Sequence, residues 1–220
     1  MQFDQTASLE DDADQPLSRA DRRDQTMQHI MNAATRCFVR SGFQGASMQQ
    51  VCAEAGMSPG ALYRYFPSKE AIIEAISEAH RKDDADIFAR MFENPDIVDG
   101  FVRAAMEHIR HIHEAGTAPL FAEIRAESMR NPAVSTICQA TMADVDSAFR
   151  NYLDSAIARG DVAPVIETDV LIPMMVAVCE GLVITDIVGM GIPFDRVETM
   201  LRLSVESLLR PRVPSIPNHL

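Results

Sequence analysis

The sequence of 220 residues predicts an all-α fold of about nine helices. Over most of the chain, apolar residues recur three and four positions apart, which is the spacing of one face of a helix. No segment alternates apolar and polar residues over a useful length, so we expect no β-sheet. Glycines and prolines divide the later part of the chain into helical segments near residues 96–115, 119–130, 133–159, 167–188 and 194–209.

The first helix is expected to begin near Ser18 and to end before Gly42. Its apolar side chains form one stripe, which would pack on the next two helices: Met27, Ile30, Met31, Ala34, Cys37 and Phe38. A fourth helix is expected to follow Lys69 and to connect two domains.

Residues 47–70 predict two short helices joined by a glycine turn. Ser47 and Gln50 form a capping-box pair at the start of the first helix, and Gly56 ends that helix. Ser58 and Pro59 suit the N-cap and the first position of the second helix. This arrangement is typical of a helix-turn-helix.

The second of these helices has one apolar face and one face suited to DNA. Leu62 and Phe66 share the inward face, four positions apart. Small residues at the leading end allow a close approach to a major groove. At and after the C-terminal end of this helix, hydroxyl and ammonium donors are carried by Tyr63, Tyr65 and Lys69. Such donors suit phosphate oxygens.

The charge of the chain is distributed unevenly. The net charge is −12, with −5 on residues 1–21, +4 on residues 22–69 and −11 on the remainder. Charges farther apart than about 8–10 Å are largely screened at physiological salt, so a locally positive segment can bind phosphate within an acidic chain.

Residues 22–76 resemble the N-terminal domain of the tetracycline-repressor (TetR) family. The resemblance rests on a basic helix start, Ala33-Ala34, Phe38, Gly42-Phe43, Ser47, Ala53-Glu54-Ala55-Gly56, Ser58, Leu62-Tyr63-Arg64-Tyr65-Phe66 and Ser68-Lys69-Glu70. It implies phosphate contacts by Ser47, Tyr63, Tyr65 and Lys69, and base-reading positions at Ser58, Pro59, Gly60, Ala61 and Arg64. Cys52, Pro59 and Ala61 depart from the commoner family residues, so the resemblance does not identify the operator sequence.

The expected organisation has four parts. Residues 1–17 form a disordered acidic tail, and residues 18–66 form the helix-turn-helix DNA-binding domain. Residues 67–210 form a helical ligand-binding and dimerisation domain, followed by a flexible tail at 211–220.

The last two helices carry apolar faces too broad for one small core. The residues expected at a dimer interface are Leu171, Met174, Val178, Leu182, Val197, Met200, Leu201, Val205 and Leu208. The family resemblance also implies a four-helix interface between two copies. The alternative is a monomer in which these apolar faces are packed in a single core. Residues 170–192 contain Glu180 and Asp186, so we expect a buried helix there and no membrane partner.

Methionine-rich middle helices suggest a pocket of loose specificity, although a core filled with methionine is an equal alternative. The pocket hypothesis names Met91, Met106, His108, Phe121, Met129, Met142, Met175 and Cys179. Glu123, Arg125, Glu127 and Arg130 are expected to form a solvated face of ion pairs.

No metal or other cofactor is expected. His108, His111 and His113 lie close in sequence, but no further ligand stands beside them at a metal-binding spacing. The cysteines Cys37, Cys52, Cys138 and Cys179 are far apart and fit core positions better than a thiol sensor.

The sequence therefore predicts a ligand-responsive, homodimeric transcription regulator, a repressor released from a palindromic DNA operator by a small-molecule effector. No signal peptide is recognised, so a cytoplasmic location is expected. Catalytic motifs are absent, which argues against an enzyme. The alternative is a constitutive DNA-binding or protein-interaction adaptor without a ligand.

Overall fold

The computed structural model describes residues 18–212, except the side chains at positions 83, 141 and 144. The predicted tail at 1–17 and most of the predicted tail at 211–220 lie outside this part of the chain. The described residues form ten helices and no β-strand, which confirms the all-α prediction: α1 (Arg19–Gly45), α2 (Met48–Glu54), α3 (Pro59–Tyr63), α4 (Lys69–Asp83), α5 (Ala85–Glu93), α6 (Ile97–Glu114), α7 (Ala118–Ser128), α8 (Pro132–Arg159), α9 (Thr168–Ile184) and α10 (Phe194–Leu209). About nine were expected; the structure divides residues 69–93 into two helices at Asp84.

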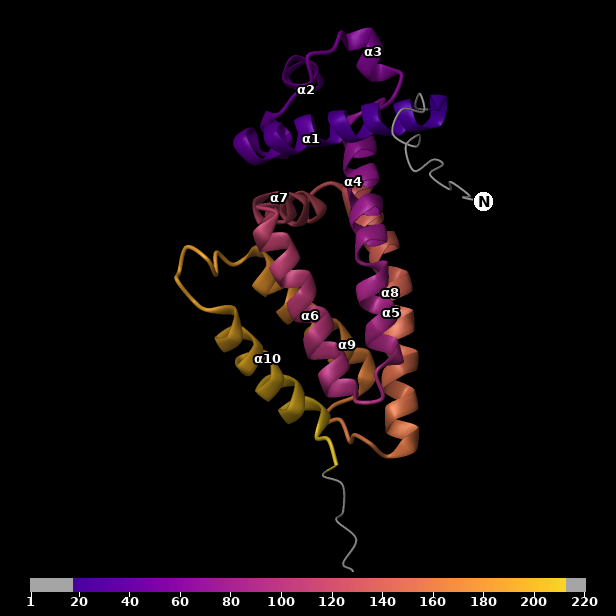
Figure 1. The fold of residues 1–220 in the computed structure, drawn as a ribbon, viewed down its shortest axis with the longest axis vertical. Helices are drawn as coiled ribbons and strands as arrows, with labels where there is room; N and C mark the ends of the chain where they lie inside the picture. Colours follow the sequence, from indigo (N-terminus) through magenta and orange to yellow (C-terminus); the bar gives the residue numbers. More distant parts are fainter. Residues whose placement is uncertain (1–17, 213–220) are drawn as a thin grey trace, which may run out of the picture.

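The helices form a small head on an elongated body (Figure 1). In the head, α1 lies across the molecule and carries α2 and α3 on the side away from the body. α4 runs from the head into the body, where α6 packs against α5, α8, α9 and α10. α7 lies directly beneath α1 and packs on it.

Two clusters of buried apolar side chains correspond to the head and the body. The head cluster joins the stripe of α1 to α2 and α3, but it also takes Ile72, Ile73 and Ile76 from α4. Leu120 and Ile124 of α7 belong to it as well. The expected domain boundary after residue 66 falls between α3 and α4. The apolar packing of the head does not stop there, because α4 and α7 contribute to it.

The first helix breaks at Gly42, the residue before which it was expected to end, and a short helical segment follows the break. α1 extends to Gly45, but Gly42 has non-helical angles of φ 69° and ψ 161°. A positive φ is adopted readily by glycine and rarely by other residues, so the break falls at the residue that tolerates it. It redirects the chain toward α2 and buries Phe43, which is 1% exposed.

α9 is the most apolar helix of the chain and was the segment considered for a membrane. Within residues 18–212, no helix is both long and apolar enough to cross a bilayer. α9 packs instead on α6, α7 and α8 of the body.

The four cysteines are free thiols. Cys37 is buried in the head, and burial raises the pKa of its thiol. Cys138 of α8 and Cys179 of α9 are partly buried. Burial raises the pKa of Cys138, and it raises the pKa of Cys179 to about 12.

We expect Cys179 to react slowly with iodoacetamide at pH 8, because a pKa near 12 instead of 9.0 leaves roughly a thousandfold less thiolate. Peptide mass spectrometry after timed labelling of the folded protein measures this rate. The same peptide in denaturant is the control. Labelling of Cys179 at equal rates in the folded and denatured protein would contradict this expectation, because the fold would then not suppress the reactivity of the thiol.

Candidate DNA interface and ligand cavity

Local hydrogen bonds define the two helices of the predicted helix-turn-helix. The Ser47 hydroxyl accepts from the Gln50 backbone N–H at 3.2 Å, and the Gln50 side chain accepts from the Ser47 backbone N–H at 2.7 Å. Gly56 has φ +63°, and the Met57 N–H donates back to the Cys52 carbonyl at 2.9 Å. The capping box and the glycine turn are therefore confirmed.

α3 presents the residues expected to read bases to solvent. The Ser58 hydroxyl caps the helix by accepting from the Ala61 N–H at 3.3 Å, and Pro59 occupies the first turn. Leu62 is fully buried beneath the helix, so it fixes which face points outward. On the outer side, Ser58, Pro59, Gly60 and Arg64 are exposed and Ala61 is half-buried.

The residues expected to bind phosphate have different surroundings. Ser47 is exposed, and Tyr63, the last residue of α3, is 50% exposed. Tyr65 is half-buried, and its ring lies 5.2 Å from the Arg23 guanidinium. Lys69 is engaged within the protein, because its Nζ donates to the carbonyls of Phe43 at 2.6 Å and of Ala46 at 2.8 Å. Of three ammonium protons, Lys69 therefore has one left for a phosphate.

The broken end of α1 is held from both sides. From the head, Lys69 binds the Phe43 carbonyl, and its ammonium lies 4.5 Å from the Phe43 ring centroid. From the body, a carboxylate oxygen of Glu123 on α7 accepts from the Phe43 N–H at 3.1 Å. A Cβ at Gly42 would lie 3.3 Å from that same oxygen. The Glu123 carboxylate therefore packs closely against the backbone of Gly42, where a side chain would crowd it.

Glu127, one turn further along α7, corrects the expectation of a solvated ion-pair face. Its side chain is 0% exposed and accepts from Gln44 at 2.5 Å and from Arg130 at 3.0 Å. Burial alone would raise the pKa of this carboxyl, but hydrogen bonds from Arg130, Asn131 and Gln44 outweigh burial and lower it. Glu127 is therefore an ionised contact between head and body.

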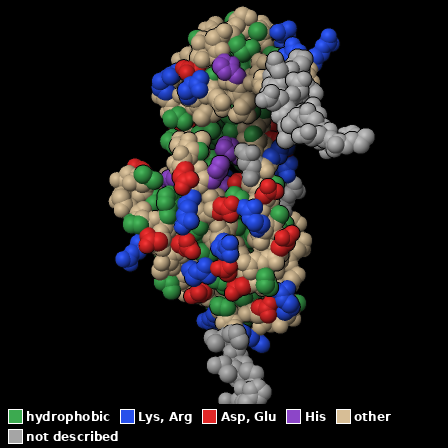
Figure 2. All heavy atoms as spheres, viewed as in Figure 1, with side chains coloured by type: hydrophobic (Ala, Val, Ile, Leu, Met, Phe, Trp, Pro, Cys, Tyr) green, Lys and Arg blue, Asp and Glu red, His purple; other side chains and the backbone are tan. Residues whose placement is uncertain are grey.

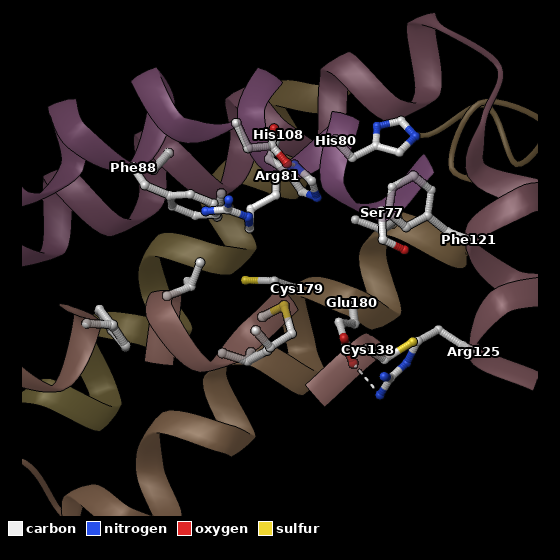
Figure 3. A pocket seen from close by; sticks show the side chains of 18 of the residues that line it. Ser77, His80, Arg81, Phe88, His108, Phe121, Arg125, Cys138, Cys179 and Glu180 are labelled. Carbon is white, nitrogen blue, oxygen red and sulfur yellow. Dashed lines mark ion pairs between the residues drawn. The ribbon is translucent and has the colours of Figure 1, made fainter. Parts of the chain in front are cut away.

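A cavity of about 210 Å³ lies in the body between α4, α5, α6, α7, α8 and α9 (Figure 3). Five of the residues named from the sequence line it: Met91, His108, Phe121, Met142 and Cys179. Three do not. Met106 and Met175 are each 2% exposed and fill the core, and Met129 is 90% exposed at the end of α7. Helical spacing indicates a face, but it does not distinguish core from cavity wall.

The sequence reasoning missed one polar wall of the cavity. Ser77, His80, Arg81 and Asp84 line it from α4 and from the break between α4 and α5. They follow the helical spacing i, i+3, i+4 and i+7, which was the signal that could have identified them. His80 stacks at a tilt on Phe121, with ring centroids 5.0 Å apart.

Two polar contacts bridge different helices at the cavity. Arg125 of α7 pairs with Glu180 of α9 at 2.8 Å, as the dashed line in Figure 3 shows. His108 Nδ1 of α6 lies 2.9 Å from an Asp84 carboxylate oxygen, in an orientation that does not form a hydrogen bond. The remaining lining is largely apolar, so the cavity fits a mainly apolar molecule with a few polar groups.

The histidines of α6 point to different places. His108 faces the cavity, His111 is exposed, and His113 Nε2 lies 3.1 Å from the Leu182 carbonyl. Within residues 18–212, no three side chains of His, Cys, Asp or Glu are grouped as metal ligands.

The expected dimer interface is corrected at four positions. Leu171, Val197, Leu201 and Val205 are buried in the core of their own chain, so they cannot contact a partner. Leu182 and Leu208 are partly buried against that core. Met174, Val178 and Met200 are exposed, and further exposed apolar residues lie beside them on α9 and α10: Val170, Ile184 and Leu203.

The comparisons with known proteins agree with this arrangement. Residues 30–76 match the family model described as bacterial regulatory proteins of the tetR family. The transcriptional regulator UidR of Escherichia coli K12 is 34% identical over 144 residues, which cover 65% of this chain and 72% of UidR.

Solved structures show the same fold. Salmonella enterica GusR superposes with a TM-score of 0.73 at 28% identity, covering 84% of this chain and 96% of GusR. The regulator FadR of Bacillus subtilis, solved with stearoyl-CoA, gives a TM-score of 0.68 at 15% identity over 81% of this chain and 96% of FadR. UidR and the repressor AcnR of Corynebacterium glutamicum, which also matches in sequence, are named as regulators of transcription. Together with the helix-turn-helix of the head, these similarities show that the chain belongs to the TetR family of DNA-binding transcriptional regulators.

Proposed function

We propose that this protein is a dimeric repressor that binds a palindromic operator and is released from it by a small-molecule effector. The observation that carries this proposal is the connection between the cavity and the head. α4 and α7 both line the cavity, and both also pack in the head cluster. A molecule that moves either helix would move the head.

The exposed face of α3 supports contact with base edges in the major groove. Gly60 and Ala61 have small side chains, so the helix can approach the floor of the groove closely. Arg64 is the one long donor among the predicted base-reading residues, and an arginine suits the two acceptors of guanine. Tyr63, half exposed at the side of α3, is placed for a phosphate.

The exposed apolar side chains of α9 support a dimer. Val170, Met174 and Val178 follow one another every four residues and form a stripe on a surface that would otherwise contact water. Two copies joined at such faces would present two heads, and recognition helices separated by roughly 34 Å meet successive major grooves. A two-fold protein requires a palindromic site.

An effector can act only through a difference in its affinity for the DNA-fitting and non-fitting states. The cavity supports an effector over the constitutive adaptor, because a packed core would have served the adaptor equally well. FadR of Bacillus subtilis has the same fold and was solved with stearoyl-CoA. The cavity of this chain, at about 210 Å³, suits a much smaller molecule than stearoyl-CoA.

Arg64→Ala should cost about 1–3 kcal/mol at one base pair and little elsewhere, if Arg64 reads a guanine. Tyr63→Phe should instead weaken binding to all sequences alike, because a phosphate contact carries no sequence information. Binding to a selected genomic fragment and to its single base-pair variants, followed by fluorescence anisotropy, separates the two. Uniform loss in Arg64→Ala would refute the base-reading role. Lys69 is unsuitable for this test, since its substitution would also release the end of α1.

In a screen of small apolar and amphipathic metabolites, a compound that binds in the cavity should raise the melting temperature of the wild type. A ligand at a hundred times its Kd stabilises by about 2.7 kcal/mol, or roughly 5–10 °C for a chain of this size. Ala105→Phe places a ring in the cavity and should abolish the shift, whereas Ala126→Phe on the exposed side of α7 should retain it. A shift that persists in Ala105→Phe would place the ligand elsewhere, and a protein that no compound stabilises would favour the adaptor.

A further inference from the structure

A buried carboxylate in the wall of the body cavity lacks a hydrogen bond. It belongs to Asp84, which stands between α4 and α5 and lines the cavity with a side chain that is 9% exposed. His108 Nδ1 lies 2.9 Å away, but its orientation does not form a hydrogen bond. Among the described residues, no other N–H or O–H group donates to this carboxylate. Burial of a charged group without hydrogen bonds is costly, so the carboxylate is available to a donor that enters the cavity.

The backbone at Asp84 explains why the carboxylate has no local donor. An aspartate that precedes a helix usually accepts from the N–H groups of the first turn. Asp96 does so at the start of α6, where Val98 and Asp99 donate to it at 2.9 and 3.0 Å. Asp84 has right-handed helical angles of φ −82° and ψ −11°, and its side chain does not cap α5.

The other charges of the cavity lining are paired within the protein. Figure 2 shows acidic and basic side chains side by side over the visible face of the body. At the cavity, Arg81 donates to both carboxylate oxygens of Glu78 at 2.8 and 2.9 Å, and Arg125 pairs with Glu180 at 2.8 Å. Counted with neutral histidines, Asp84 is therefore the lining charge of the described chain that has no oppositely charged partner. A ligand of positive charge would supply one.

The rest of the lining indicates the size and shape of such a ligand. Phenylalanine rings surround the space, and Figure 3 shows two of them, Phe88 and Phe121, on either side of His108. Cavities of roughly 150 Å³ in other proteins admit benzene. The cavity of about 210 Å³ therefore suits one ring with a short side chain.

We propose that the cavity binds a compact organic cation, an apolar ring that carries a protonated amine, and that the ammonium group donates to the Asp84 carboxylate. The inference rests on the proposed function and names the chemical class of its effector. α4 packs in the head at its start and ends beside Asp84, so the ammonium group binds at the cavity end of a helix that reaches the head.

The wild type can be tested with three probes of similar size and different charge: 2-phenylethylamine, 2-phenylethanol and phenylacetate. Isothermal titration calorimetry of the full-length protein at pH 8, above the ordinary titration range of histidine, measures each affinity. The amine should bind at least about tenfold more tightly than the alcohol, because its charge pairs with a buried carboxylate. Phenylacetate should bind most weakly, since like charges repel. No binding of the amine at millimolar concentration, or binding no tighter than that of the alcohol, would overturn the proposal.

Two variants of equal charge locate the ammonium group. Asp84→Asn keeps the shape of the side chain and should weaken binding of the amine at least about tenfold, while binding of the alcohol stays within about twofold. Asp86→Asn removes the same charge from an exposed position of α5 and should keep the wild-type affinities. Melting temperatures without probe report the folding of both variants. Undiminished preference for the amine in Asp84→Asn would show that its charge is bound elsewhere.

Failure of this inference can be distinguished from failure of the proposed function. Fluorescence anisotropy of a labelled genomic fragment measures whether a probe that binds the protein also releases the DNA. Binding of the amine through Asp84 without release would support the ligand class and contradict the effector role. Release by the alcohol or by phenylacetate, without binding of the amine, would overturn the cation and leave the proposed function intact.

Discussion

The end of α1 at Phe43 is the contact on which the rest of the structure depends. Its carbonyl is bound by Lys69 of α4, its N–H is bound by Glu123 of α7, and its ring is buried against Phe38. Both neighbouring side chains are charged, and hydrogen bonds to charged groups are stronger than those between neutral groups. The head is therefore attached to the body at defined atoms, and a movement in the body can reach it there.

The cavity uses the same two helices that meet at Phe43. α4 contributes Ser77 and His80 to the cavity and Ile72 and Ile73 to the head cluster. α7 contributes Phe121 to the cavity and, on another face, the carboxylates that hold α1. A ligand that separates α4 from α7 would pull the two attachments of Phe43 apart. The proposed effector would therefore have two routes to the head, through α4 and through α7.

Local signals made the head predictable. The capping box at Ser47, the turn at Gly56 and the cap at Ser58 depend on residues at most a few positions apart, so the sequence contains them completely. The surroundings of Glu127 depend instead on a residue far away in the sequence, because Gln44, which donates a hydrogen bond to it, is 83 residues away. Spacing placed Glu127 on a helix face, but it could not show which element covers that face.

The same limit explains the errors in the body. On α9 and α10 the apolar pattern is broad, so Leu171 and Met174 looked equivalent, yet the first is buried in its own chain and the second is 56% exposed. The difference follows from how both helices pack on α6, which is a tertiary property. Met129 was likewise assigned by residue type, although the end of α7 leaves it in solvent. Where several helices pack around one core, the apolar pattern predicts that a residue contacts other apolar residues. It does not predict whether those residues belong to the same chain or to a second copy.

In the proposed dimer, two copies of this chain place two heads on one duplex. Native mass spectrometry of the full-length protein, alone and with a fragment selected from the source genome, measures this directly. We expect a dimer without DNA and an even number of chains on each duplex. A single chain bound to the duplex, or a protein that stays monomeric and binds no fragment, would contradict it.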